Sequence, residues 1–245
     1  MQARLTSRRP PLRRAINITR KKLKEAGHIT ILFNFIEGKE ANEIVNRMWT
    51  ADGGAEVQRD SDATGEPLPP TVEWWIGHSS GVKAATVSET WQNQHKKTLL
   101  AQRFLEKWQA TKQKTGTGRP IDGLIMPSTP FPTSRHNSGW PWHYGEFSAL
   151  LDLTTGVFPV TRVDLEKDTV STDWKPITVK DKEVMEYCKL AQLPFQIGDT
   201  DVKLDGKPEN HENALVGLAL IGRRLEEEKV TAMLTLIRDV VGVDY

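Results

Sequence analysis

Residues 121–161 carry the pattern that most constrains how this chain folds. A short apolar run ends at Pro127, and a second apolar run, 156–160, follows later. Proline fixes φ and disfavours helix at the preceding residue, so the first run is expected to be a strand that ends in a loop. Between the runs lie a polar, aromatic loop and a short helical segment at about 144–152. A strand, a loop, a helix and a second strand favour an α/β protein with its site at the strand ends.

The residues before this pattern predict a helix, a strand and a second helix. Apolar or small side chains from Leu12 to Leu23 recur at i, i+4, i+7 and i+11, which defines one helix face, and Gly27 is placed to end that helix. Residues 29–36 are mostly apolar and predict a strand, and 40–51 predicts the second helix. Helix and strand in alternation are expected around a sheet that is covered on both faces.

A long helix and a central strand are predicted further along. The helix begins at Thr86 or Ser88, with Glu89 near its start, and runs to about residue 112. Its apolar side is expected from Trp91, Leu99, Phe104, Leu105 and Trp108. Residues 214–221 are apolar almost throughout and predict a strand buried on both faces. A last helix follows, with Leu225, Val230, Met233, Leu234 and Ile237 on its inner face.

Three segments in this order carry a resemblance to a known family. They are Asp-Gly-Leu-Ile-Met-Pro-Ser-Thr-Pro at 122–130, Gly-Val-Phe-Pro-Val-Thr at 156–161 and Val-Gly-Leu-Ala-Leu-Ile-Gly-Arg-Arg at 216–224. The chain resembles the C-terminal half of the amidase signature family, especially its fungal acetamidase-like branch. The resemblance implies part of a mixed-sheet α/β/α fold with helices on both faces. By this resemblance, residues 1–245 are expected to form one portion of a domain, with an uncertain start at 1–9 and a variable excursion at 162–213.

The same resemblance implies a function and a set of site residues. Family members hydrolyse amides with a Ser–Ser–Lys triad in their N-terminal half, so no catalytic residue is expected in this chain, and we expect it to be inactive alone. It is expected to form one wall of the acyl pocket. The candidate residues follow the first strand or lie in the loop after it: Pro127, Ser128, Thr129, Pro130, Trp140, Trp142 and Tyr144. The chain departs from the family at Leu215 and Ala219, where Pro and Gln are usual.

Two other functions are weighed against this hypothesis. One is a non-catalytic binding domain that pairs with another protein. The other is a small serine hydrolase, because residues 77–81 read Gly-His-Ser-Ser-Gly and fit the G-x-S-x-G elbow, with residues 72–76 as its strand. Ser79 would then be the nucleophile, with His211 and Asp199 or Asp201 completing a triad.

Composition narrows the expected partners and location. The 33 basic and 32 acidic residues nearly balance, which argues against nucleic-acid binding. The single cysteine excludes an internal disulfide and a cysteine cluster for metal, and it predicts a reducing compartment, the cytoplasm. No cofactor is expected. Residues 1–24 contain nine basic side chains and no acid, which keeps a mitochondrial location as an alternative. No apolar run approaches the roughly 20 residues that span a bilayer. A small amide is the expected substrate once an N-terminal half completes the site, and self-association into a homo-oligomer is left open.

Overall fold

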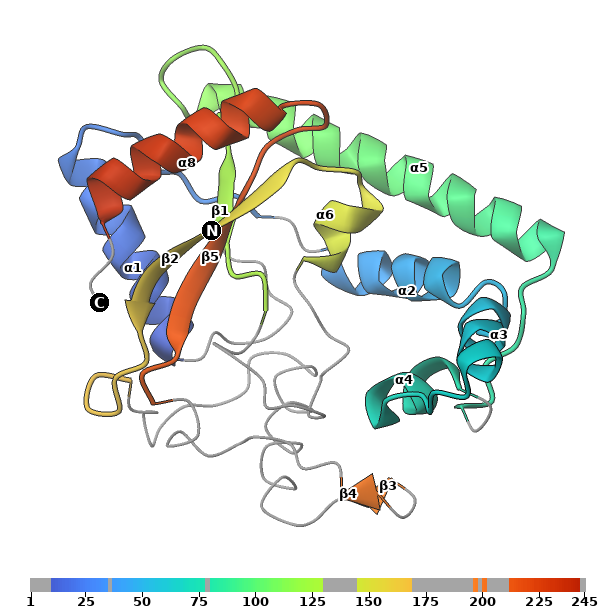
Figure 1. Ribbon diagram of the computed structural model, residues 1–245. Helices are drawn as coiled ribbons and strands as arrows, with labels where there is room; N and C mark the ends of the chain where they lie inside the picture. The colour runs from blue at the N-terminus through green and yellow to red at the C-terminus, as the bar shows by residue number, and fades with distance from the viewer. Residues whose placement is uncertain are drawn as a thin grey trace, which may run out of the picture.

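A computed structural model describes residues 10–34, 37–77, 80–129, 145–168, 196–197, 200–201 and 212–242. Within these ranges the organising element is a three-stranded antiparallel sheet with the order β1-β5-β2 (Figure 1). Strand β1 is Leu124–Met126, β2 is Thr155–Arg162 and β5 is Leu215–Ile221. The strands predicted before Pro127, at 156–160 and at 214–221 are therefore confirmed, and β5 lies in the centre.

The register of the sheet explains why both faces of β5 are apolar. Leu124 pairs with Ile221 on one side of β5, and Thr155 pairs with the same residue on the other. Because side chains alternate between the faces of a strand, Leu218 and Leu220 face one layer, whereas Ala219 and Ile221 face the other. The register shifts between Pro159 and Thr161, where proline has no N–H to donate to the ladder.

Helices α1 and α8 cover one face of the sheet (Figure 1). Helix α1 is Pro10–Glu25 and α8 is Glu227–Val241. The two helices are also joined to each other, since the Lys22 ammonium donates to the backbone carbonyl of Val241. The buried side chains between these helices and the sheet are Leu12, Ala15, Leu23, Phe158, Val160, Val163, Val216, Leu218, Leu220, Val230, Ile237 and Val241.

Three helices cover the opposite face over β1 and the end of β5. They are α2 (Gly38–Trp49), α5 (Val87–Ala110) and α6 (Glu146–Leu150). The predicted α/β architecture with helices on both faces is thus confirmed for the described residues. Phe104 and Trp108 of α5 are central to this second core, where Phe104 contacts Phe147 with ring centroids 5.8 Å apart.

The remaining described elements are three helical segments and a two-stranded hairpin. Helices α3 (Ala55–Thr64) and α4 (Pro70–Ile76) connect α2 to α5, the 3-10 turn η2 (Thr111–Gln113) ends α5, and β3 (Gln196–Ile197) pairs with β4 (Thr200–Asp201). The start of α5 follows the prediction, because the Thr86 hydroxyl accepts from the Glu89 N–H and the Glu89 carboxylate accepts from the Thr86 N–H.

The strand predicted at residues 29–36 is wrong for its described part. Residues 28–34 form neither helix nor strand, and residues 35 and 36 lie outside the described ranges. Ile29 and Leu32 are 63% and 55% exposed, so only Phe33 of this apolar stretch reaches the core. The sequence has the composition of a strand, but a strand also needs a neighbour that shares its backbone hydrogen bonds.

The inner faces of the two long helices also differ from the prediction. In α5 the buried apolar residues are Leu100, Phe104 and Trp108, whereas Trp91, Leu99 and Leu105 are exposed. At about 100° of rotation per residue, these three side chains point roughly 100–140° away from the middle of the face formed by Leu100, Phe104 and Trp108. Leu225 precedes α8 at φ 60° and is 77% exposed, so the interior face of that helix begins with Val230.

Candidate functional site

The end of strand β1 holds the part of the candidate site that the structure describes. Pro127 is buried directly after the strand, and Ser128 and Thr129 are partly exposed beside it. The Ser128 carbonyl accepts a hydrogen bond of 3.0 Å from the N–H of Gly145, which precedes α6. This bond joins the two ends of the segment between 128 and 145, and we call it the neck.

Helix α6 fixes the neck to the core through a buried polar contact. Glu146, 6% exposed, accepts a hydrogen bond from the side-chain amide of Asn42 on α2. The Ser148 hydroxyl donates 2.7 Å to the Gly145 carbonyl, and Phe147 packs on Phe104 of α5. A buried carboxylate without a partner would be costly, so these contacts make the position of α6 specific.

The structure describes only some of the predicted pocket residues. Pro127, Ser128 and Thr129 lie together at the strand end, as the proline-rich sequence indicates. The other predicted residues, Pro130, Trp140, Trp142 and Tyr144, lie outside the described residues, in the segment whose ends the neck joins. Sequence reasoning missed Asn42 and Glu146. The available signal was Glu146 itself, an acid within the otherwise apolar start of a helix.

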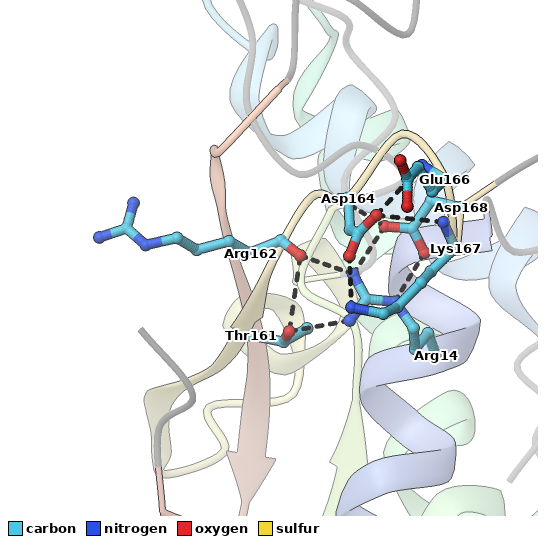
Figure 2. Close-up of polar contacts among 7 residues, drawn as sticks. All are labelled: Arg14, Thr161, Arg162, Asp164, Glu166, Lys167 and Asp168. Carbon is cyan, nitrogen blue, oxygen red and sulfur yellow. Dashed lines mark hydrogen bonds and ion pairs between the residues drawn. The ribbon is translucent and has the colours of Figure 1, made fainter.

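A second polar cluster lies where β2 ends, as Figure 2 shows. Arg14 of α1 donates to both carboxylate oxygens of Asp168, from Nε at 2.8 Å and from Nη2 at 2.7 Å. Its guanidinium also donates to the Thr161 hydroxyl, at 2.9 Å, and to the Arg162 carbonyl. The Asp168 side chain is 2% exposed. The hydrogen bond that Arg14 donates to Asp168 raises the pKa of Arg14, so the guanidinium stays charged.

The turn after β2 completes this cluster (Figure 2). The Asp168 carboxylate accepts from the Asp164 N–H at 2.9 Å, and Asp164 in turn accepts from the backbone N–H groups of Glu166 and Lys167. The Lys167 ammonium, a third donor to Asp164, lowers the pKa of that carboxyl together with these N–H groups. Since its charged groups are paired with one another, the cluster serves to hold α1 to the end of β2.

The described residues do not support a serine-hydrolase elbow. Residues 72–76, which that hypothesis requires as a strand, lie in helix α4. Ser79, His211 and Asp199 lie outside the described residues, and Asp201 belongs to β4. In the part of the chain that the structure describes, no group of three or more His, Cys, Asp or Glu side chains is placed to hold a metal ion.

Comparison with known proteins identifies the family. The model of the Amidase family matches residues 2–231, which is nearly the whole chain. The chain belongs to the amidase family. A putative amidase of Curvularia clavata, kk1C, is 73% identical over 225 residues, which cover 92% of this chain and 39% of that protein. An acetamidase of Emericella nidulans is 28% identical over 95% of this chain and 38% of its own length.

A solved structure shows the same fold. Fatty acid amide hydrolase matches 99% of this chain with a TM-score of 0.78 at 24% sequence identity, and the match covers 39% of that chain. The amidase chain described here therefore spans about two fifths of the length of the relatives that it matches. This coverage agrees with the prediction of a C-terminal portion of an amidase. Over the described helices, none has both the length and the apolar character needed to cross a membrane.

Proposed function

We propose that this chain forms one wall of the acyl pocket of an amide hydrolase and acts together with a catalytic part that carries the Ser–Ser–Lys triad. The observation that carries the proposal is the coverage, because almost the whole chain matches amidases while spanning only 39% of the Curvularia clavata relative. Amide hydrolysis needs a nucleophile, a base and an oxyanion hole. The resemblance assigns these groups to the part of the relatives that lies outside the match.

The neck gives the wall its position. The end of β1 is fixed by its pairing with β5, and the return of the chain at Gly145 is fixed by α6. Ser128 and Thr129 therefore lie on a rigid element, which is the arrangement that holds a substrate with little loss of freedom. We assign the aromatic residues Trp140, Trp142 and Tyr144 to the same wall, and a small amide to the pocket.

The test combines this chain with the missing part. The portion of the Curvularia clavata relative outside the matched region is co-expressed with this chain, and hydrolysis of acetamide and hexanamide is measured for each part and for the pair. We expect ammonia release from the pair and none from this chain alone. Hydrolysis by this chain alone, or none by a purified pair, would contradict the proposal.

A variant tests the pocket wall itself. Ser128→Trp fills the space at the strand end, so we expect kcat/KM for hexanamide to fall at least about tenfold more than kcat/KM for acetamide, the size of effect that pocket contacts produce. Thr98→Trp, on the exposed side of α5, is the control and should change neither value. Equal losses for both amides would remove Ser128 from the acyl wall.

The remaining alternatives have their own readouts. A fluorophosphonate that labels this chain alone, with labelling lost in Ser79→Ala, would support a small serine hydrolase instead. A stable complex without amide hydrolysis would favour an interaction domain. We place the activity in the cytoplasm on the strength of the single cysteine, and fluorescence microscopy of a tagged chain distinguishes this from mitochondria.

A further inference from the structure

Helix α6 is too short to fix its own position. It spans Glu146–Leu150, so its five residues make little more than one helical turn. An isolated helix of this length is not stable in water, so side-chain contacts must hold α6 in place. The start of α6 matters for the candidate site, because the Gly145 N–H forms the neck with the Ser128 carbonyl. A contact that fixes α6 therefore also fixes the chain that follows β1.

The side chains of α6 make two kinds of contact. Phe147 and Leu150 are buried in the apolar core over β1, where Phe147 packs on Phe104 of α5. Apolar contact is non-directional, so it keeps the helix in the core but does not select one rotation of it. Glu146 adds a directional contact, because its buried carboxylate accepts a hydrogen bond from the side-chain amide of Asn42. The orientation of α6 therefore depends on Glu146.

Helix α2, which carries Asn42, is itself held to the long helix α5. The buried side-chain amide of Asn93 on α5 donates a hydrogen bond of 2.9 Å to the Ile44 carbonyl. Arg103 of α5 forms an ion pair with Glu40 near the start of α2. The position of α5 is thus passed to α2, and the hydrogen bond from Asn42 passes it on to α6, which lies beside α2 (Figure 1).

Packing alone does not account for a carboxyl group at this place. Burial removes the group from water, and an apolar side chain of similar size at a buried polar site is often neutral or stabilising. The neighbours Phe147 and Leu150 show that the core around α6 accepts apolar side chains. What Glu146 adds is a fixed geometry, which is the use that buried polar groups have in several proteins.

We propose that Glu146 is the positioning residue of the acyl wall, and that it sets how tightly the pocket binds longer acyl chains. The hydrogen bond with Asn42 orients α6, and the orientation of α6 places the Gly145 N–H against the Ser128 carbonyl. A misplaced wall loses contact with the methylene groups of a substrate, and each such group is worth about tenfold or more in kcat/KM. Acetamide has a single methyl group, so it depends least on the wall. This role rests on the proposed function.

The first experiment tests the position of the neck without any measurement of activity. Hydrogen exchange of this chain, followed by NMR, compares the Gly145 amide with the slowest amides of β5, which report on the whole fold. In Glu146→Met the Gly145 amide should exchange at least about tenfold faster relative to β5 than in the parent chain. Asp168→Ala removes a buried contact between α1 and the turn after β2, so it should not increase this ratio. An unchanged ratio in Glu146→Met overturns the proposal.

The second experiment measures specificity in the complex with the catalytic part of the Curvularia clavata relative. In Glu146→Met, KM for hexanamide should rise about tenfold with kcat nearly unchanged, while KM for acetamide should rise less than about twofold. Asp168→Ala lowers stability without touching α6, so it should leave the ratio of the two KM values unchanged. Equal changes for both amides in Glu146→Met would show a structural role only and would overturn the proposal.

An exchange of donor and acceptor tests the hydrogen bond itself. Glu146→Gln keeps an acceptor oxygen for Asn42, so KM for hexanamide should stay within about twofold of the parent value. Asn42→Asp places two carboxylates against each other and should raise KM for hexanamide as Glu146→Met does. Asn42→Asp combined with Glu146→Gln restores one donor and one acceptor and should recover the parent KM. A folded double variant that keeps the KM of Asn42→Asp overturns the proposal.

The outcomes in the complex separate this role from the proposed function. An absence of hydrolysis by the parent complex overturns the proposed function, and the role of Glu146 with it. Hydrolysis by the parent complex, with the same ratio of KM values in Glu146→Met, keeps the function and overturns the role. Hydrolysis with a raised KM for hexanamide in Glu146→Met, recovered by the exchange of donor and acceptor, supports both.

Discussion

At the scale of single residues, the contact between Arg14 and Asp168 carries the largest expected effect on stability. Asp168 is nearly inaccessible and receives hydrogen bonds from a guanidinium and a backbone N–H. A carboxylate in this setting adds little when compared with an apolar pair, but removal of one partner leaves the other charge without compensation. The contact therefore makes the junction between α1 and β2 specific.

Asp168→Ala is expected to lower the free energy of unfolding by about 3 kcal/mol, because Arg14 loses its ionic partner while partly buried. Urea unfolding followed by circular dichroism measures the change. Glu25→Ala removes an exposed ion pair of 3.8 Å with Lys21 and should cost less than about 0.5 kcal/mol. If the two variants lose similar stability, Arg14 and Asp168 do not form the buried pair described here.

Glu226 makes the stability of the fold depend on pH. Burial raises the pKa of this carboxyl, but hydrogen bonds from the side chain and the N–H of Arg223, with the charge of Lys229, outweigh it and lower the pKa below 4.5. The unfolded chain then binds the proton more readily than the folded chain. The stabilisation is present above the ordinary pKa and is lost as the pH falls through the lowered one.

Glu226→Gln is accordingly expected to cost about 1 kcal/mol at pH 7, the usual net contribution of an intramolecular hydrogen bond, because the amide oxygen can still accept from Arg223 but carries no charge. The difference from the parent chain should shrink as the pH falls through the lowered pKa of Glu226, because the folded carboxyl then becomes protonated. Guanidinium unfolding at a series of pH values measures the difference in free energy, with the exposed Glu228→Gln as control. A difference that stays the same across the whole acid range would show that the charge of Glu226 is not the cause.

At the scale of elements, two glycines at the ends of α3 form a matched pair. Gly54 and Gly65 have φ angles of 82° and 68°, in the left-handed region where a side chain costs about 1 kcal/mol. A Cβ at Gly54 would lie 2.2 Å from the carbonyl oxygen of Ile76, whereas nothing lies within 4 Å of one at Gly65. Gly54 therefore allows a close approach between α3 and the end of α4.

We expect Gly54→Ala to destabilise the chain by at least about 1 kcal/mol more than Gly65→Ala, because only the first adds a steric clash to the backbone strain. Thermal unfolding of the two variants makes the comparison. Equal losses would mean that α4 moves away from Gly54 without cost. The same measurement therefore reports how firmly α4 is held against α3.

The elements themselves were largely predictable from sequence, for physical reasons. The helices at α1, α2, α5 and α8 have a 3.6-residue period or capping residues, and β2 and β5 are apolar runs bounded by turns. Residues 29–34 could not be assigned correctly, because strand composition does not reveal whether a neighbouring strand is present. The prediction of the inner face of α5 was partly wrong for a similar reason. The helix has apolar residues on several sides, and packing against Phe33 and Phe147 selects one of them.

The candidate site was predictable only in part. Pro127 marks the strand end in the sequence, so the place of Ser128 and Thr129 followed from local rules. The contact between Asn42 and Glu146 joins residues 104 positions apart, and no local pattern connects them. The same holds for Arg14 and Asp168, which are 154 positions apart. Such contacts depend on the assembled layers, so they became visible only with the structure.

At the scale of the whole molecule, β5 joins two cores that otherwise have separate helices. Its side chains enter one core at Leu218 and Leu220 and the other at Ala219 and Ile221. A strand shared in this way couples the layers, so loss of packing on one face weakens the other. We expect the described fold to unfold as one cooperative unit.

Leu218→Ala should lower the free energy of unfolding by about 3 kcal/mol, since Leu218 is fully buried between β5 and the helices α1 and α8. Hydrogen exchange locates the effect. The slowest amides of α5, on the opposite face, should lose as much protection as those of α8. Loss confined to α1 and α8 would show that the two cores unfold independently.

The neck has a consequence for changes in the length of the segment between 128 and 145. The two ends of this segment are joined by one hydrogen bond, from the Gly145 N–H to the Ser128 carbonyl. A change in its length therefore need not shift the register of β1 or the position of α6. Doubling the length of such a loop costs only about 0.6 kcal/mol in closure entropy. We therefore expect a change in the number of residues between Ser128 and Gly145 to leave the sheet and the helices around it in place.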